Sequence, residues 1–149
     1  MNAMEINNYV VDMYDMVGKK CEYGDAMEKL NKHEMIFYIA QEVEAEVNNG
    51  GFWQFFYNSS GDLSNQVVAA FQAIGATQIA EICRKAVDVF GESVPVDREE
   101  RQELMEQLGL EEGNEILCEC DEAFYGYADD LVELNYQYIE KHREYFGEM

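Results

Sequence analysis

Among the side chains of this protein, the carboxylates offer the widest range of possible chemistry. Acidic residues number 31 against 10 basic ones, and the formal net charge is −21. Carboxylates can act as acid and base in a reaction when two are held at separated pKa values, can bind divalent cations, or can present an array of negative charge to a basic protein. With so many acids, close pairs arise by chance, so an ordered row is more informative than a pair.

The clearest row of carboxylates lies in LEEGNEILCECDEAFYGY, residues 110–127. At 100° per residue, a helix here places several glutamates within about 80° of one another or just beside that arc. These are Glu111, Glu112, Glu115, Glu119 and Glu122. The opposite face would hold Ile116, Cys120, Phe124 and Tyr127. We therefore expect one amphipathic helix with a carboxylate stripe, unless Gly113-Asn114 delays its start and removes Glu111 and Glu112.

A second row of carboxylates beside this one would be needed to reach the charge density of duplex DNA, a polyanion that many basic proteins bind. The six acids between Glu111 and Glu122 span about 18 Å of helix, roughly one charge per 3 Å. Duplex DNA presents about one charge per 1.7 Å of its axis. Residues 97–108 could supply the second row through Glu99, Glu100, Glu103 and Glu106. Arg98 and Arg101 lie among them and weaken it, and the short loop LGLEEG brings the rows close if the two helices are antiparallel neighbours.

Other chemistry finds few starting points in the sequence. The chain has two histidines and contains no G-x-S-x-G, P-loop, H-E-x-x-H or glycine-rich dinucleotide turn. It also lacks the D-x-[DN]-x-[DN]-G pattern of a calcium loop. Cys118 and Cys120 form only a C-x-C pair far from either histidine, which does not suit zinc. We expect no catalytic residues, no metal, no cofactor, and free, mostly packed thiols.

The charge imbalance argues against direct binding of nucleic acid or of an anionic membrane, because both require basic surface. Residues 92–149 hold 18 acidic and 4 basic residues, a net charge of −14. The longest apolar runs, such as FFY and VVAAF, are far shorter than the roughly 20 residues of a membrane-spanning helix. The N-terminus MNAMEINNYV lacks the basic and apolar regions of a secretory signal, so we expect a cytoplasmic protein.

Apolar spacing predicts an all-α fold, with several packed helices and short loops in a single compact domain over residues 1–149. Segment 33–49 has a core-facing apolar stripe and ends at Gly50-Gly51. Asp97 with Glu100, and Asp130 with Glu133, resemble the starts of capped helices. Further helical segments are expected over 7–17, 63–76 and 77–91, followed by the acidic C-terminal helices in about 97–146.

The stretch FWQFFY, residues 52–57, is unusually rich in aromatic side chains. In a short helix after the glycine pair, Phe52, Phe55 and Phe56 share one face. Trp53 and Tyr57 share another, at i and i+4. Two interpretations are open: a core plug joining two helical hairpins, or an aromatic groove for a ligand or peptide.

The run EVNNGGFWQFFYNSSG, followed by AFQAIGA, resembles a bacterial family of largely unknown function whose best-known member is a DNA-mimic protein. The matching core, NGGFxQFxxN with AIGA downstream, covers about residues 34–91. The resemblance implies an all-helical fold, no known catalytic residues and, for the mimic, binding to a transcription factor through a DNA-like acidic surface. The motif positions, for which it implies a structural role, are Asn49, Gly50, Gly51, Phe52, Gln54 and Asn58.

We therefore expect a non-enzymatic protein that presents carboxylates to the basic surface of a protein partner, with a DNA-binding protein as the favoured partner. One alternative is an immunity-type or peptide-binding module that uses residues 52–57. Another is a family member whose acidity serves only solubility. Both a monomer and a homodimer are compatible with the sequence.

Overall fold

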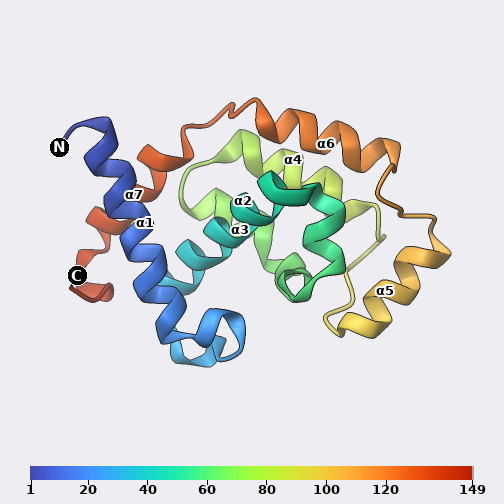
Figure 1. The fold of residues 1–149 in the computed structure, drawn as a ribbon, viewed down its shortest axis with the longest axis horizontal. Coiled ribbons are helices and arrows are strands. Elements are labelled where there is room, and N and C mark those ends of the chain that lie inside the picture. Colours follow the sequence, from blue (N-terminus) through green and yellow to red (C-terminus); the bar gives the residue numbers. More distant parts are fainter. Residues whose placement is uncertain (149) are drawn as a thin grey trace.

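A computed structural model describes residues 1–148 of the chain. Those residues form seven α-helices joined by loops and 3-10 turns, without any β-strand, so the predicted all-helical fold is confirmed (Figure 1). No helix in this part of the chain is long and apolar enough to cross a membrane. The helices are α1 (Ala3–Lys20), α2 (Lys32–Tyr57), α3 (Val67–Ala73), α4 (Thr77–Asp88), α5 (Arg98–Gln107), α6 (Glu115–Tyr125) and α7 (Leu131–Lys141).

Helix α2 is the central element of the fold. It contacts α1, α3, α5, α6 and α7, as well as the 3-10 segment η3 (Ser59–Gln66). In Figure 1, α1 and α7 lie at the left of the molecule, α5 lies at the right, and α6 crosses the top. The apolar stripe predicted for this helix supplies core side chains, among them Ile39, Val43 and Val47, each at most 2% exposed.

Side-chain caps set the first residues of the C-terminal helices. Asp97 accepts a hydrogen bond from the Glu100 amide at 3.0 Å, and Asp130 accepts one from the Glu133 amide at 3.2 Å. Each bond satisfies an amide that has no partner within its helix. Both predicted helix starts are confirmed.

Helix α6 begins later than the carboxylate row in the sequence. Asn114 is its N-cap and accepts a hydrogen bond from the Leu117 amide at 3.0 Å. The first helical residue is therefore Glu115, and the delay expected from Gly113-Asn114 does occur. As a result, Glu111 and Glu112 lie in the loop before the helix.

The inward face of α6 differs from the predicted one in two positions. Leu117, Cys120 and Phe124 are buried. Ile116 is 52% exposed, so its predicted place on the core face is wrong. Tyr127 follows the end of the helix and is 39% exposed. Relative to the predicted orientation, α6 is rotated about its axis so that Leu117 enters the core together with Phe124. This rotation leaves Ile116 at the edge of the buried face.

The glycine pair in α2 bends the helix. Gly50 and Gly51 leave helical geometry, with Gly51 at φ 79°, and the chain then resumes a helical course to Tyr57. The second half buries Phe52, Phe55 and Phe56, each at most 1% exposed. The prediction that these three rings share one face is confirmed, and that face is directed into the core.

The cysteines are free thiols, as expected from the sequence. Cys21, Cys83 and Cys120 are buried and Cys118 is half-buried. Burial raises the pKa of the Cys120 thiol, with Asp121 contributing in the same direction. A raised pKa keeps a thiol protonated and unreactive at neutral pH.

Candidate functional site

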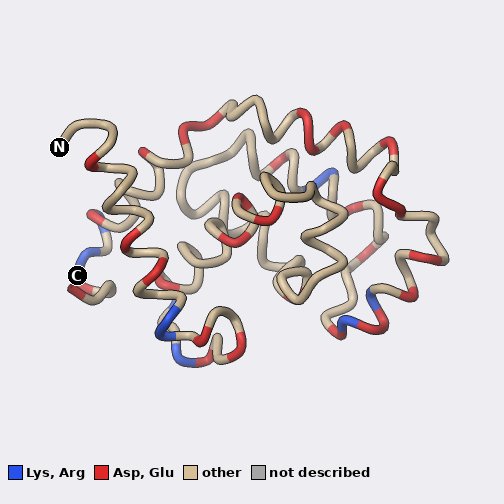
Figure 2. Tube along the Cα trace, viewed as in Figure 1, with Lys and Arg blue, Asp and Glu red and all other residues tan. Residues whose placement is uncertain are grey.

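Three glutamates form an exposed row along α6: Glu115, Glu119 and Glu122. This helix carries no lysine or arginine, and Figure 2 shows its acidic positions spaced along the top of the molecule. The row runs over eight residues, or seven helical rises, so its carboxylates lie on average about 5 Å apart along about 10 Å of helix axis. A single DNA strand presents about one charge per 3.4 Å. Helix α6 alone is therefore more dilute than DNA.

The acidic row of α5 does not lie beside that of α6. Helix α5 packs against α2 and η3, whereas α6 packs against α2 and α4. In Figure 1, α6 runs away from α5 across the top of the molecule, and the loop 108–114 joins them at the corner. The antiparallel pairing considered for these two helices is not formed, because each is anchored to a different part of the core.

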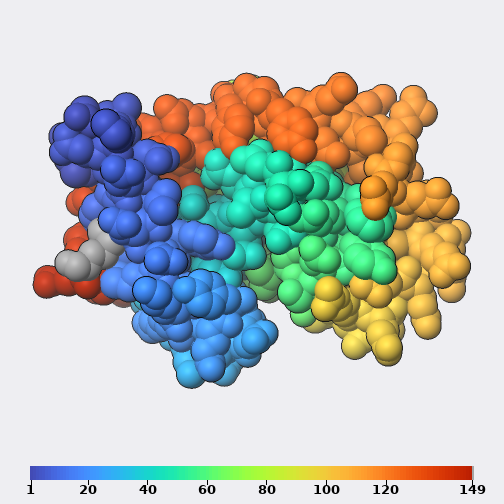
Figure 3. All heavy atoms as spheres, in the orientation of Figure 1, coloured from blue at the N-terminus to red at the C-terminus, as the bar shows by residue number. Residues whose placement is uncertain are grey.

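The predicted carboxylates instead follow a bent path over α5, the loop 108–114 and α6. In Figure 3 the gold and orange surface of these segments borders the green surface of the second half of α2. All eight carboxylates are on exposed residues. We call this set the acidic face, and it consists of Glu99, Glu103, Glu106, Glu111, Glu112, Glu115, Glu119 and Glu122.

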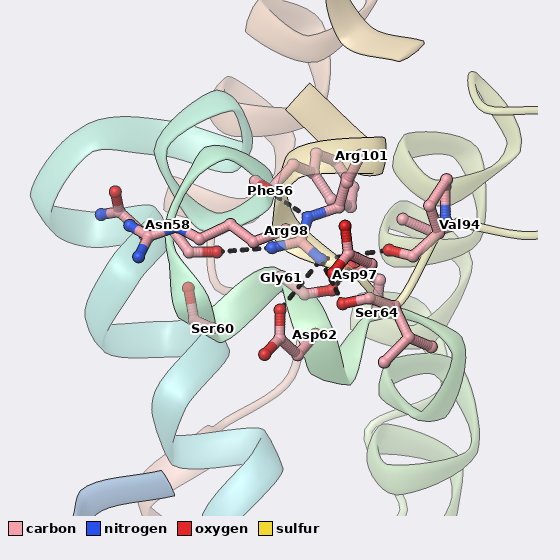
Figure 4. Close-up of polar contacts among 12 residues, drawn as sticks. Phe56, Asn58, Ser60, Gly61, Asp62, Ser64, Val94, Asp97, Arg98 and Arg101 are labelled. Carbon is pink, nitrogen blue, oxygen red and sulfur yellow. Dashed lines mark hydrogen bonds and ion pairs between the residues drawn. The ribbon is translucent and has the colours of Figure 1, made fainter. Parts of the chain in front are cut away.

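Arg101 does not belong to this surface, because it is fully buried at 0% exposure. Its Nε donates to the Phe56 carbonyl at 2.6 Å, and its Nη2 donates to the Asn58 carbonyl at 2.8 Å. Its Nη1 donates to two carbonyls of the loop before α5 and lies 3.0 Å from Asp62 Oδ1 (Figure 4). The guanidinium thus joins α5 to the C-terminal end of α2, where carbonyls lack helical partners.

Gly61 leaves the space that Arg101 occupies. A Cβ at Gly61 would lie 2.6 Å from Arg101 Nε and 2.5 Å from the Phe56 carbonyl oxygen. Arg98 also turns toward the end of α2, where its Nε donates to the Tyr57 carbonyl at 3.4 Å. Arg101 therefore does not interrupt the acidic row at the surface, whereas Arg98 remains exposed among the glutamates of α5.

A pocket of about 770 Å³ opens between the second half of α2, helix α5 and the loop 108–114. Trp53 and Tyr57 line it as a stacked pair, with ring centroids 4.7 Å apart and planes inclined by 17°. Five carboxylates of the acidic face also line it: Glu99, Glu103, Glu106, Glu111 and Glu112. The sequence indicated the acidic row and the aromatic pair separately, but it did not indicate that they share one pocket.

The aromatic segment is divided between core and surface. Its three phenylalanines are core residues, as the core-plug interpretation requires, whereas Trp53 is half-buried and Tyr57 is 41% exposed. A groove built from all five rings is therefore not formed. Only the stacked pair reaches the surface, at the pocket.

Comparison with known proteins bears on both the motif and the acidic helices. The model of the DMP19-like protein family matches residues 28–142. The chain belongs to this family. The matched range is wider than the motif-bearing core of about 34–91 and takes in α5, α6 and α7. No curated protein and no solved structure matches the chain.

Two motif positions of this DMP19-like chain tie the second half of α2 to its first half. Gln54 Nε2 donates to Glu46 Oε2 at 3.1 Å, and Asn58 Nδ2 donates to the same oxygen at 3.3 Å. Both amides therefore bridge the bend at the glycine pair. Asn49 is exposed, and nothing in the structure explains its presence in the motif.

Gly51 and Phe52 of the motif contact a carboxylate from α6. The Phe52 amide donates to Asp121 Oδ1 at 2.7 Å, so Asp121 caps the resumed helix. A Cβ at Gly51 would lie 2.4 Å from Asp121 Oδ2, and Gly51 also has a positive φ. Burial raises the pKa of Asp121, and the Phe52 hydrogen bond opposes that rise. Asp121 therefore positions α6 and is not part of the acidic face.

The inward orientation of Arg101 was not predicted from the sequence, although its position in α5 carries one signal for it. Arg101, Leu104 and Met105 stand at i, i+3 and i+4 in α5, the spacing of one helix face. Leu104 is half-buried and Met105 is buried, and Arg101 lies on the same inward face. An arginine at a position on the apolar face of a helix is the pattern that could have indicated this inward orientation.

Proposed function

We propose that this protein is a non-enzymatic acidic binding protein that acts as a DNA mimic, occupying the basic surface of a DNA-binding protein through its acidic face. Membership of the DMP19-like protein family supports a relation to DNA mimics. The observation that carries the proposal is the exposure of eight glutamates over α5, the loop 108–114 and α6, while the arginines of α5 turn toward α2.

The mechanism is competition for one surface. Carboxylates take the places of DNA phosphates against lysine and arginine side chains, and long-range attraction speeds the encounter. Because α5 and α6 diverge, the charges follow a bent line, and each helix meets a different part of the partner surface. Such an interface weakens as salt screens its exposed charges.

A charge-reversal variant tests this proposal. The protein is immobilised and used at low salt to capture proteins from a lysate of its source organism, and bound proteins are identified. The triple variant Glu115→Lys, Glu119→Lys and Glu122→Lys is expected to lose the captured DNA-binding protein while it keeps its helical circular dichroism.

The matched control reverses three exposed acids outside the acidic face: Asp12→Lys, Glu28→Lys and Glu144→Lys. These positions lie in α1, a 3-10 turn before α2 and a 3-10 turn after α7. The control changes the net charge equally and is expected to retain the partner. Equal loss in both variants would mean that total charge alone governs binding, and retention in both would contradict the proposal.

A further inference from the structure

The pocket between α2, α5 and the loop 108–114 combines two kinds of surface. One is the stacked pair of Trp53 and Tyr57, and the other is the set of five glutamates from α5 and the loop. A cation over the face of an aromatic ring is attracted by the ring quadrupole, most strongly over tryptophan. Carboxylates beside the rings add charge-assisted hydrogen bonds to the same ligand.

Two neutral side-chain donors of the pocket are already used by the protein. Trp53 Nε1 donates to the Leu110 carbonyl at 3.1 Å, and Gln102 Nε2 donates to the Tyr57 carbonyl at 2.8 Å. Among residues 1–148, no lysine or arginine lines the pocket. A ligand therefore meets ring surfaces and carboxylate acceptors, which favours a ligand that is itself cationic and rich in donors.

We propose that this pocket binds an arginine side chain from a basic segment of a partner protein. The guanidinium lies against the Trp53–Tyr57 pair and donates to the surrounding glutamates. Arginine suits the site better than lysine because its flat guanidinium stacks on aromatic rings and carries five donors in a fixed arrangement. The inference rests on the proposed function, because it takes the partner to be a basic protein, and it names the point at which that partner is anchored.

The number of carboxylates favours a protein segment over a small free cation. One guanidinium pairs with one carboxylate in the bidentate arrangement, or with two singly. Five glutamates line this pocket, which is more than one guanidinium can pair with. A segment with several basic residues can meet the remaining carboxylates, whereas a single arginine cannot.

Trp53 is the only tryptophan in the chain, so its fluorescence reports on this pocket directly. The intact protein is titrated with a hexa-arginine peptide, a hexalysine peptide and spermidine. We expect hexa-arginine to change the Trp53 emission and to bind about fivefold to tenfold more tightly than hexalysine. Binding of hexa-arginine without a change in emission, or equal or tighter binding of spermidine at the same site, would overturn the proposal.

Variants in which glutamates or Tyr57 are replaced locate the binding site of hexa-arginine. The affinity of each variant for the peptide is measured by calorimetry. Glu103→Gln with Glu106→Gln should weaken hexa-arginine about tenfold. The matched pair Glu119→Gln with Glu122→Gln removes the same charge from α6 and should weaken it less than about twofold. Tyr57→Ala, at an exposed position, should weaken it about fivefold. Equal effects of the two glutamate pairs would show that hexa-arginine binds to negative charge anywhere on the surface, and would contradict binding in the pocket.

The same variants separate this inference from the proposed function. If the captured DNA-binding protein binds the Glu103→Gln, Glu106→Gln and Tyr57→Ala variants as it binds the parent, the pocket proposal fails and the mimic proposal stands. If hexa-arginine binds in the pocket but duplex DNA does not compete with any captured protein, the mimic proposal fails instead.

Discussion

At the scale of single residues, Arg101 decides how α5 presents its charges. Its guanidinium is directed into the protein and bonds carbonyls at the end of α2, so the glutamates of the same helix face solvent without it. A buried arginine is stable only when its donors are satisfied, as they are here by carbonyls and by Asp62. This internal contact thus keeps one of the two arginines of α5 away from the acidic face.

Replacing Arg101 should therefore destabilise the fold. Arg101→Leu removes the Arg101 donor from the Phe56 carbonyl and leaves the Asn58 carbonyl with the Gly61 amide alone, and we expect the free energy of unfolding to fall by about 3–5 kcal/mol. Urea denaturation followed by circular dichroism measures this change. Arg98→Leu is the control, since Arg98 is exposed and makes one 3.4 Å bond; we expect it to cost less than about 1 kcal/mol. Similar losses in both variants would contradict the anchoring role.

Gly51 should be intolerant of a side chain for two separate reasons. Gly51→Ala places a Cβ against the Asp121 carboxylate and holds alanine at a positive φ. We expect a loss of about 2–4 kcal/mol in the free energy of unfolding. Gly109→Ala is the control, because Gly109 also has a positive φ but no atom near its added Cβ; we expect a loss of about 1–2 kcal/mol there. If the two losses are equal, the contact with Asp121 is not what requires glycine.

At the scale of elements, the bend in α2 and the carboxylate of Asp121 hold α6 in place. Asp121 caps the resumed helix at Phe52, while Gln54 and Asn58 bridge the bend through Glu46. These residues of the family motif therefore fix the bend in α2 and its contact with α6. The bend determines where the stacked pair of Trp53 and Tyr57 reaches the surface beside α5.

Asp121 should also give the scaffold a pH dependence. Its pKa in the folded protein is raised above the ordinary value of 3.8 by burial. The folded state therefore binds this proton more tightly than the unfolded chain, and stability falls as pH rises from 3.8 through the raised pKa. Asp121→Asn removes this loss, so the variant should gain stability relative to the parent on going from about pH 4 to pH 7.

Urea midpoints of the parent and of Asp121→Asn at several pH values test this expectation. Asp12→Asn is the control, because it removes one negative charge from an exposed position on α1. A difference between Asp121→Asn and the parent that stays constant with pH, or that shrinks toward pH 7, would show that burial does not perturb this carboxyl.

Helix starts were readable from local sequence, whereas the rotation of α6 about its axis and the contacts between helices were not. Asp97 and Asp130 cap their helices as predicted, because capping depends on residues three positions apart. Ile116 was placed wrongly, since the rotation of α6 is set by how Leu117 and Phe124 fit the core. The inward turn of Arg101 and the divergence of α5 from α6 depend on distant parts of the chain, which periodicity does not describe.

At the scale of the whole molecule, charge and shape are arranged together. The C-terminal residues 92–149 carry a net charge of −14, and eight of their glutamates form the acidic face. Binding through this face should be sensitive to salt, because its charges are exposed and screened. We expect the affinity for a captured DNA-binding protein to fall at least tenfold between about 50 mM and 200 mM salt, as measured by surface plasmon resonance. An affinity indifferent to salt would favour an apolar interface instead.

The most direct test of DNA mimicry is competition between this protein and duplex DNA for the captured DNA-binding protein. Fluorescently labelled duplex is bound to that partner, and the protein is titrated in while anisotropy is followed. DNA mimicry predicts full displacement of the duplex, lost in the Glu115→Lys, Glu119→Lys and Glu122→Lys variant and kept in the Asp12→Lys, Glu28→Lys and Glu144→Lys control. A complex in which the partner holds the duplex and this protein together would contradict it.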